Sequence, residues 1–274
     1  MLKAIQPQKH LFLTAIITVL FLATGCSTIP ITGRSGLHLV PESELIAMGS
    51  QQYDEVLSDS QLSRNYSQVQ MVRRVGNRIA QAAERFLIEH GHAGEVGYYQ
   101  WEFNLIEDSD TANAWVMPGG KAAVYTGILK YTRDETGMAV VLGHEVAHAI
   151  AGHGNERMSG ELLANMGGMA LSTALSSQPQ ATYDLFMQAY GAGASVGFLL
   201  PYSRLHESEA DRIGLILMAR AGYDPRAAVG LWQRMGQDGG PRPPEFLSTH
   251  PSPASRITDI QRHLPEALVY YQGR

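Results

Sequence analysis

The feature that most constrains this chain is an apolar run that carries two histidines and a glutamate, GMAVVLGHEVAHAIAGH at residues 137–153. A buried carboxylate without a partner is costly, so Glu145 needs a specific reason to lie in such a run. His144 and His148 are four residues apart, so on a helix both imidazoles project from one face, one turn apart. Two ligands of one tetrahedral zinc ion require this placement.

The glutamate of this motif lies beside the histidine face. From there Glu145 can take a proton from an attacking water without binding the metal itself. HEVAH therefore predicts a hydrolytic site with one Zn²⁺ per chain, held in part by His144 and His148. The alternative, two core histidines satisfied by hydrogen bonds, is disfavoured because the run follows a β segment and begins at a capping box, Thr132 with Glu135.

A catalytic zinc needs a third protein ligand, and His153 is one option. The metzincin pattern HExxHxxGxxH requires a glycine at position 151 and a histidine at position 154, where this chain has Ala151 and Gly154. On a continuing helix, at about 100° per residue, His153 also falls on the face opposite to His144. We interpret His153 as a residue behind the ligands or at the helix C-terminus.

The segment RLHESEADRIGLILMA at 204–219 supplies a better option. Glu207 and Asp211 are one helical turn apart, with Gly214 on the same face. We predict that Glu207 is the third ligand, that Asp211 orients a ligand histidine, and that Gly214 lets this helix approach the HEVAH helix closely. The alternative is an exposed, charged helix.

These motifs carry a family resemblance. HEVAH, the pair Glu207 and Asp211 in ESEAD, NAWVMPGG at 113–120 and THPSPASRI at 249–257 follow one another in an order that resembles the gluzincin zinc metallopeptidases of the HtpX, BepA and LoiP type. That family is related to the CAAX prenyl proteases and the mitochondrial OMA protease. The short format is most similar to the LoiP-like lipoprotein form.

The resemblance implies an α+β fold, a mainly helical zincin-type domain with a small β-sheet whose edge strand faces the active-site cleft. It implies zinc on His144, His148 and Glu207, with Glu145 as general base. It places His250 near the metal, either blocking the water site or stabilising the oxyanion, with help from Arg256. It also implies that an extended substrate pairs with an edge strand formed by Asn113, Ala114, Trp115, Val116 and Met117.

The N-terminal residues differ in character from the rest. Lys3 and Lys9 precede the apolar block LFLTAIITVLFLA and the cysteine of ATGC, a pattern that resembles a lipoprotein signal. We expect a signal peptide at 1–25, lipidation at Cys26, a tether at 26–40 and the metallopeptidase domain at 41–274. An ordinary signal with an incidental cysteine is the alternative. The expected location is the bacterial cell envelope, on the periplasmic face of the outer membrane.

Local patterns predict the elements around the site. Helices are expected from Pro41 and over 67–87, a half-buried strand at 98–108, two strands within 114–129 around a Pro-Gly-Gly turn, and a helical hairpin over 162–200. Formal net charge is −5 without a long basic run, which disfavours nucleic-acid binding.

The predicted function is a zinc endopeptidase that hydrolyses misfolded or unfolded envelope proteins. One alternative is a chaperone-like outer-membrane assembly factor on the same zinc fold, working with envelope-assembly machinery. The other is a structural lipoprotein without metal.

Overall fold

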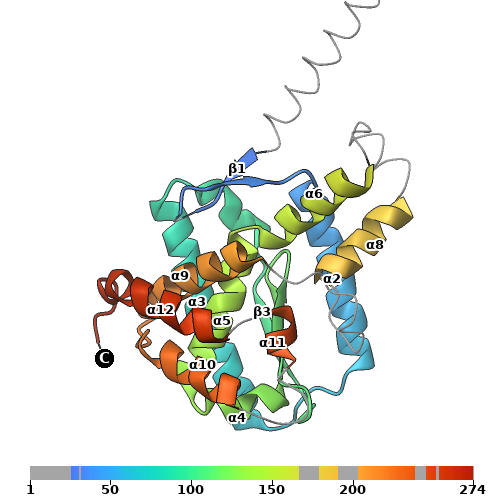
Figure 1. The fold of residues 1–274 in the computed structure, drawn as a ribbon. Helices are drawn as coiled ribbons and strands as arrows, with labels where there is room; N and C mark the ends of the chain where they lie inside the picture. The colour runs from blue at the N-terminus through green and yellow to red at the C-terminus, as the bar shows by residue number, and fades with distance from the viewer. Residues whose placement is uncertain are drawn as a thin grey trace, which may run out of the picture.

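The computed structural model describes residues 26–30, 32–166, 179–190, 203–237, 245–250 and 253–273. The expected signal peptide lies outside this set, as does most of the expected hairpin over 162–200. In chain order the described elements are β1 (Cys26–Thr28), β2 (Ser35–Leu37), α2 (Glu42–Asp59), α3 (Tyr66–Glu89), η1 (Ala93–Tyr98), β3 (Glu102–Ile106), β4 (Ala114–Met117), β5 (Lys121–Tyr125), η2 (Thr126–Ile128), α4 (Leu129–Thr132), α5 (Glu135–Ile150), α6 (His153–Met166), α8 (Pro179–Tyr190), α9 (Arg204–Arg220), α10 (Ala227–Gln237), α11 (Phe246–Thr249) and α12 (Pro253–Leu268). Figure 1 shows their arrangement, which confirms the α+β class.

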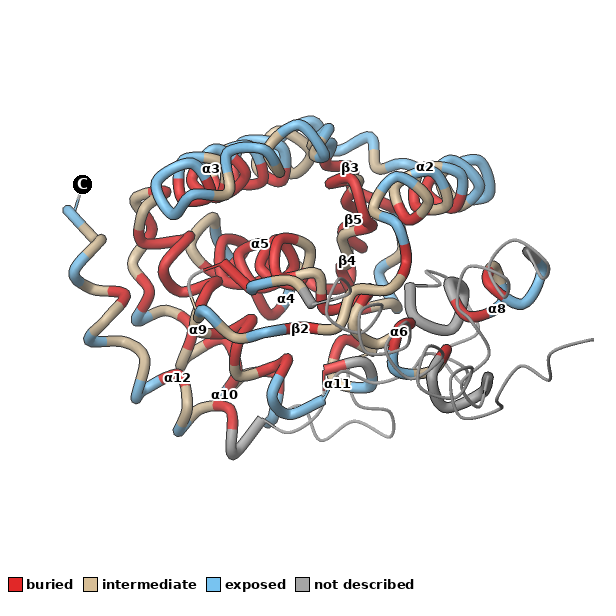
Figure 2. The backbone as a smooth tube through the Cα atoms, turned by 90° about the horizontal axis from the view of Figure 1, so that it is seen from above, coloured by how far each residue is buried: buried red, intermediate tan, exposed pale blue. Residues whose placement is uncertain are grey.

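Helix α5, which carries HEVAH, is the centre of the molecule. Figure 2 shows it buried along most of its length, with α3 on one side and α9 on the other. Its side chains join one large apolar core with the inner faces of these two helices. The helix begins two residues later than the Thr132–Glu135 capping box predicts. Asp134 is the N-cap, and its carboxylate accepts the backbone N–H of Gly137, because Thr132 is taken up as the last residue of α4.

A three-stranded sheet lies beside α5 in the order β3-β5-β4, with β3 parallel and β4 antiparallel to β5. Strands β4 and β5 are joined by the predicted turn, where Gly119 and Gly120 both have positive φ. The predicted half-buried strand is buried on both faces. Phe103 and Leu105 enter the main core, while Asn104 on the other face donates to the hydroxyl of Tyr53 on α2. Helix α2 covers the face that a half-buried strand would expose to solvent.

The segment expected as a tether at 26–40 is structured where it is described. Strands β1 and β2 pair as an antiparallel hairpin, with Ile29 buried in the core. The hairpin lies beside α6 (Figure 1). Burial of Ile29 and the ion pairs described below fix this segment to the domain. Among the described helices, none combines the length and apolar character needed to cross a membrane.

Candidate metal centre

Helices α5 and α9 cross at two glycines, and this contact sets the geometry of the site. A Cβ atom added to Gly214 would lie 2.9 Å from the carbonyl carbon of Gly143 and 3.0 Å from the backbone nitrogen of His144. Backbone therefore meets backbone at the crossing. The close approach brings the carboxylates of α9 within reach of the histidines of α5, as the sequence predicted from Gly214.

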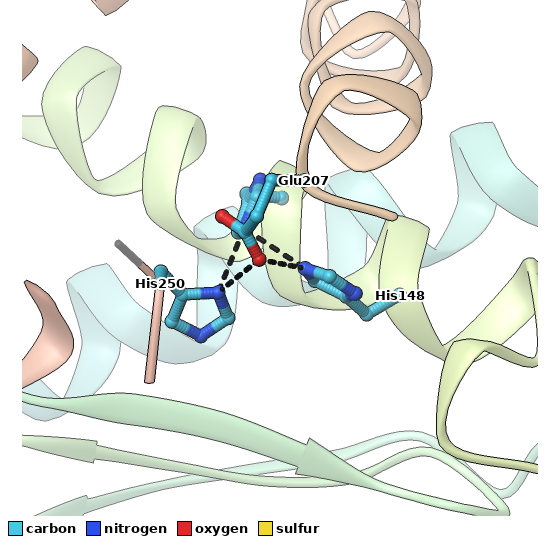
Figure 3. Close-up of side chains that lie close together, drawn as sticks. His148, Glu207 and His250 are labelled. Carbon is cyan, nitrogen blue, oxygen red and sulfur yellow. Dashed lines mark hydrogen bonds and ion pairs between the residues drawn. The ribbon is translucent and has the colours of Figure 1, made fainter. Parts of the chain in front are cut away.

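The ligand atoms converge on one point. Nε2 of His144 and Nε2 of His148 are 3.0 Å apart. Glu207 lies opposite them, with Oε1 3.3 Å from Nε2 of His148 and Oε2 3.6 Å from Nε2 of His144. Figure 3 shows the Glu207 carboxylate between the rings of His148 and His250. Ligand atoms at about 2.0–2.1 Å from a tetrahedral zinc are separated by about 3.3–3.5 Å, so the three predicted ligands fit this metal.

His250 is a fourth member of this cluster. One nitrogen or oxygen atom from each of His144, His148, Glu207 and His250 lies within 4.8 Å of the others, and all four residues are buried. Nδ1 of His250 is 2.8 Å from Oε1 of Glu207. The residue follows α11, which is tied to the sheet side because the N–H of Phe246 donates to the carbonyl of Ala112 at 3.0 Å. The structure thus places His250 at the metal position itself.

Glu145 lies next to the cluster without joining it. Its Oε1 has no hydrogen-bond partner among the described residues and is 3.5 Å from Nε2 of His250. Burial, together with the negative charge of Glu207, raises the pKa of the Glu145 carboxyl well above its usual value, although Arg256 opposes the shift. A carboxylate whose basicity is raised in this way is suited to accept a proton.

Arg256 lies behind the ligands and contacts two carboxylates. Its Nε and one terminal nitrogen donate to Asp211, each at 2.7 Å, and the other terminal nitrogen is 2.7 Å from Oε2 of Glu207. Its guanidinium also stacks on the ring of Trp232 at 3.6 Å. One terminal nitrogen also lies 2.8 Å from both ring nitrogens of His144. These contacts place Arg256 where it can hold Glu207, Asp211 and His144 in position.

The surroundings of Asp211 and Glu207 suit each carboxylate to a different role. Oδ1 of Asp211 is 3.0 Å from Nδ1 of His144, the placement predicted for a carboxylate that orients a ligand histidine. Burial opposes ionisation of Glu207, but the nearby His250, Arg256 and His144 together hold its pKa well below the usual range. An ionised Glu207 is the form that binds a cation.

His153 contacts the predicted ligand His148 on the side of the ring that faces away from the cluster. This agrees with the interpretation of His153 as a residue behind the ligands. Helix α5 ends at Ile150, and the chain turns through Gly152, at φ +64°, into α6. This turn returns the ring of His153 to a position where its Nδ1 is 2.8 Å from Nδ1 of His148. Its other ring nitrogen is 3.1 Å from Oε2 of Glu209. Glu209 lies between Glu207 and Asp211 in the same ESEAD motif, but its contact with His153 could not be predicted from that motif.

Strand β4 is one of the two edge strands of its sheet, and the prediction for the substrate strand requires an edge strand. The N–H of Tyr125 donates to the carbonyl of Asn113, and hydrogen-bonded pairs alternate along an antiparallel ladder. The backbone groups of Ala114 and Val116 therefore point away from β5. The N–H of Ala114 donates to the side-chain oxygen of Asn113. Val116 is therefore the residue of β4 that can offer both its backbone N–H and its carbonyl at the edge of the sheet.

The exposed edge of β4 adjoins the candidate metal centre. A narrow cavity beside the cluster is lined by Val116, Pro118, His148, Leu45 and Glu42, among others. Of the five residues predicted for substrate pairing, Asn113 instead lies near the His250 segment, with its amide nitrogen 3.4 Å from Oε1 of Glu245. The backbone N–H and carbonyl groups of Trp115 and Met117 point toward β5 in the ladder. Val116 is thus the residue of this strand best placed to meet a substrate backbone.

Comparison with known proteins identifies the family. The model of peptidase family M48 matches residues 71–264, more than half of the chain. The chain belongs to peptidase family M48. The predicted class of enzyme, a metallopeptidase, is confirmed at this level.

Three M48 relatives illustrate the range of similarity. The mitochondrial metalloendopeptidase OMA1 of Schizosaccharomyces pombe is 37% identical over 253 residues, which are 90% of this chain and 68% of that protein. The mitochondrial metalloendopeptidase OMA1 of Homo sapiens is 31% identical over 262 residues, 92% of this chain and 48% of that protein. The beta-barrel assembly-enhancing protease of Escherichia coli is 25% identical over 245 residues, 87% of this chain and 47% of that protein. The chain thus spans about half to two thirds of these relatives.

These relatives correct one expectation drawn from the N-terminal residues. The expected location in a bacterial envelope is wrong, because relatives from fungi, human and plant are mitochondrial by name. The comparisons support membership of M48 and do not support the LoiP-like lipoprotein form. Lipidation of Cys26 stays a prediction.

Proposed function

We propose that this M48 chain is a zinc-dependent endopeptidase that cleaves extended, unfolded or misfolded segments of protein substrates. The observation that carries the proposal is the convergence of His144, His148 and Glu207 on one point, with Glu145 beside it. A bound zinc ion supplies Lewis-acid chemistry there, which polarises a carbonyl and makes water more acidic. The neighbouring edge strand supports a substrate that is read mainly through its backbone.

Substrate binding is the first step in this account. An extended segment lies along β4 as an added strand and exchanges hydrogen bonds with the N–H and carbonyl of Val116. Backbone pairing selects chains that can become extended and places few demands on side chains. This is the basis for proposing unfolded or misfolded proteins as the substrate class.

Glu145 then carries the proton through hydrolysis. It accepts a proton from the attacking water as the new carbon–oxygen bond forms, and it delivers that proton to the amide nitrogen as the carbon–nitrogen bond breaks. The proton balance leaves Glu145 ionised again after the amine departs. Asp211 and Arg256 keep His144 and Glu207 in place throughout.

The position of His250 favours a second candidate function. Its Nδ1 lies within the ligand cluster, where it competes with substrate and water for the metal position. In a protein that keeps this arrangement, binding of unfolded chains without cleavage is the main activity, as in a chaperone-like assembly factor. Casein capture without hydrolysis by the zinc-loaded protein would favour this candidate.

Metal removal and return test the proposed function. The full chain is expected to hold one zinc and to cleave casein, to lose cleavage when a chelator removes the metal, and to regain it when stoichiometric zinc is restored. Casein cleavage that survives complete metal removal would overturn the proposal. A protein that folds without taking up zinc would overturn it as well.

A further inference from the structure

A chain of contacts joins the N-terminal hairpin to the ligand His148. The hairpin contributes Arg34, whose Nε and one terminal nitrogen donate to Oε2 of Glu209 at 2.9 and 2.7 Å. The same oxygen is 3.1 Å from Nε2 of His153, and Nδ1 of His153 is 2.8 Å from Nδ1 of His148. His148, His153 and Glu209 are all buried. Four side chains from four segments thus line up behind one ligand.

The positions of the ring protons follow from the chemistry of a ligand histidine. Nε2 of His148 faces the cluster and must be unprotonated to bind a metal, so the proton of this ring is on Nδ1. Nδ1 of His153 then accepts that proton in a hydrogen bond, and Nε2 of His153 donates to Glu209. Each of the two imidazole rings carries one proton. The orientation of His148 is fixed by the carboxylate of Glu209, with the ring of His153 between them.

The two ligand histidines are therefore oriented differently. His144 is held directly, because Oδ1 of Asp211 lies 3.0 Å from its Nδ1. His148 reaches its carboxylate, Glu209, only through His153. Partners that fix a ligand histidine commonly change metal affinity by about 10–100-fold when they are lost.

The hairpin fixes Glu209 from two positions. Besides Arg34, the hydroxyl of Thr32 donates to the other carboxylate oxygen of Glu209. The guanidinium of Arg34 also bridges to Glu156 on α6, with contacts of 2.7 and 2.8 Å. Removal of Arg34 would take away the cation that bridges Glu156 and Glu209, and Glu209 would keep only Thr32 as its contact with the hairpin.

We propose that Arg34 is a positioning residue for the metal ligand His148, acting through Glu209 and His153, so that the docked hairpin sets the metal affinity of the site. The inference rests on the metal site of the proposed function. It adds that the N-terminal hairpin, which contributes no metal ligand, affects how tightly that site binds metal. Residues 26–37, although distant in sequence from HEVAH, are then part of the machinery that holds the metal.

Zinc affinity of the full chain tests this proposal. The variant Arg34→Met is expected to bind zinc about 10–100-fold more weakly in competition with a chelating indicator. Arg212→Met is the matched control, because Arg212 on α9 makes a two-bond ion pair with Glu266 on α12, at 2.8 Å each, away from the ligands. It should lower the melting temperature of the metal-free protein while zinc affinity stays within about twofold of wild type. Wild-type zinc affinity in folded Arg34→Met would overturn the proposal.

A double-variant comparison tests whether the contacts act as one chain. Glu209→Gln should weaken zinc binding by a factor similar to that of Arg34→Met, and the double variant should be little weaker than the stronger single change. Factors that multiply in the double variant would contradict a single chain.

A conservative variant covers the case in which Arg34→Met does not fold. Arg34→Lys keeps the positive charge but lacks the planar fork, and it is expected to bind zinc at least fivefold more weakly. Wild-type affinity in Arg34→Lys would then count against the proposal. Absence of zinc from the wild-type protein would instead remove the proposed function, so the two failures are distinguishable.

Discussion

Nδ1 of His250 lies 2.8 Å from Oε1 of Glu207, so the segment after α11 reaches the same point as helix α9. The same ring has its Nε2 3.5 Å from Oε1 of Glu145. His250 therefore occupies the space between the predicted third ligand and the predicted base. Of the two roles that the family resemblance left open for His250, this geometry favours the one that blocks access to the metal.

Replacement of His250 tests that role. His250→Ala is expected to lower zinc affinity, because one candidate ligand is lost, and to raise turnover of an unstructured peptide several-fold, because the metal position is opened. The measurement is initial rate at saturating zinc. His263→Ala on α12, a histidine outside the cluster, serves as control and should change neither quantity. A loss of turnover with zinc retained would assign His250 to the oxyanion instead.

The glycine crossing predicts a large effect from one methyl group. In Gly214→Ala the new Cβ meets backbone atoms of Gly143 and His144 at about 3 Å, so α9 must shift away from α5. We expect a loss of about 1–3 kcal/mol in unfolding free energy, together with weaker zinc binding. Denaturant unfolding and zinc titration measure the two effects.

Gly160 on α6 provides the matched control. An added Cβ there has no neighbour within 4 Å, so Gly160→Ala should stabilise the protein by up to about 1 kcal/mol through helix propensity alone. Equal effects at the two positions would show that the crossing does not constrain the site.

Buried histidines predict that the metal-free protein loses stability in mild acid. Burial lowers the pKa of His153 to about 4, although Glu209 opposes the shift. The unfolded chain titrates near the ordinary value of about 6.5, so it binds a proton that the folded chain excludes between these values. Unfolding free energy should therefore fall as pH drops from about 6.5 to about 4, by up to about 3 kcal/mol from this residue. A metal-free His153→Asn variant should show a correspondingly shallower fall, and an unchanged slope would contradict the assignment.

The edge strand predicts a selective effect on substrate binding. Val116→Pro removes an N–H that points away from β5, so the sheet keeps its hydrogen bonds while a bound substrate loses one. We expect KM for casein peptides to rise about tenfold, with zinc content unchanged. Val116→Ala keeps the N–H and should stay near wild type. Similar KM values for the two variants would argue against backbone pairing at β4.

Much of the metal centre could be predicted from residue spacing. Helical periodicity alone places His144 beside His148 and Glu207 beside Asp211, and the register argument keeps His153 out of the ligand set. The convergence of these two helices was an inference from Gly214, and the crossing at Gly143 bears it out. Local rules work here because each pair lies within one turn of one helix.

The parts that could not be predicted depend on contacts between distant segments. Arg34 and Glu209 meet only after the hairpin docks on α6 and α9, and no local pattern marks a tether-like sequence as docked. The second buried face of β3 depends in the same way on α2. The role of Arg256 was also beyond local rules, because its partners Asp211 and Glu207 lie on another helix.

In the proposed mechanism, Glu145 moves the proton at a metal site formed by His144, His148 and Glu207. The most direct test is zinc content and casein hydrolysis of the full-length Glu145→Gln variant, measured on the same preparation beside wild type. We predict one zinc per chain, as in wild type, with hydrolysis reduced at least a thousandfold, on the order of a lost general base and its charge. Full hydrolysis by the zinc-loaded variant would contradict the account.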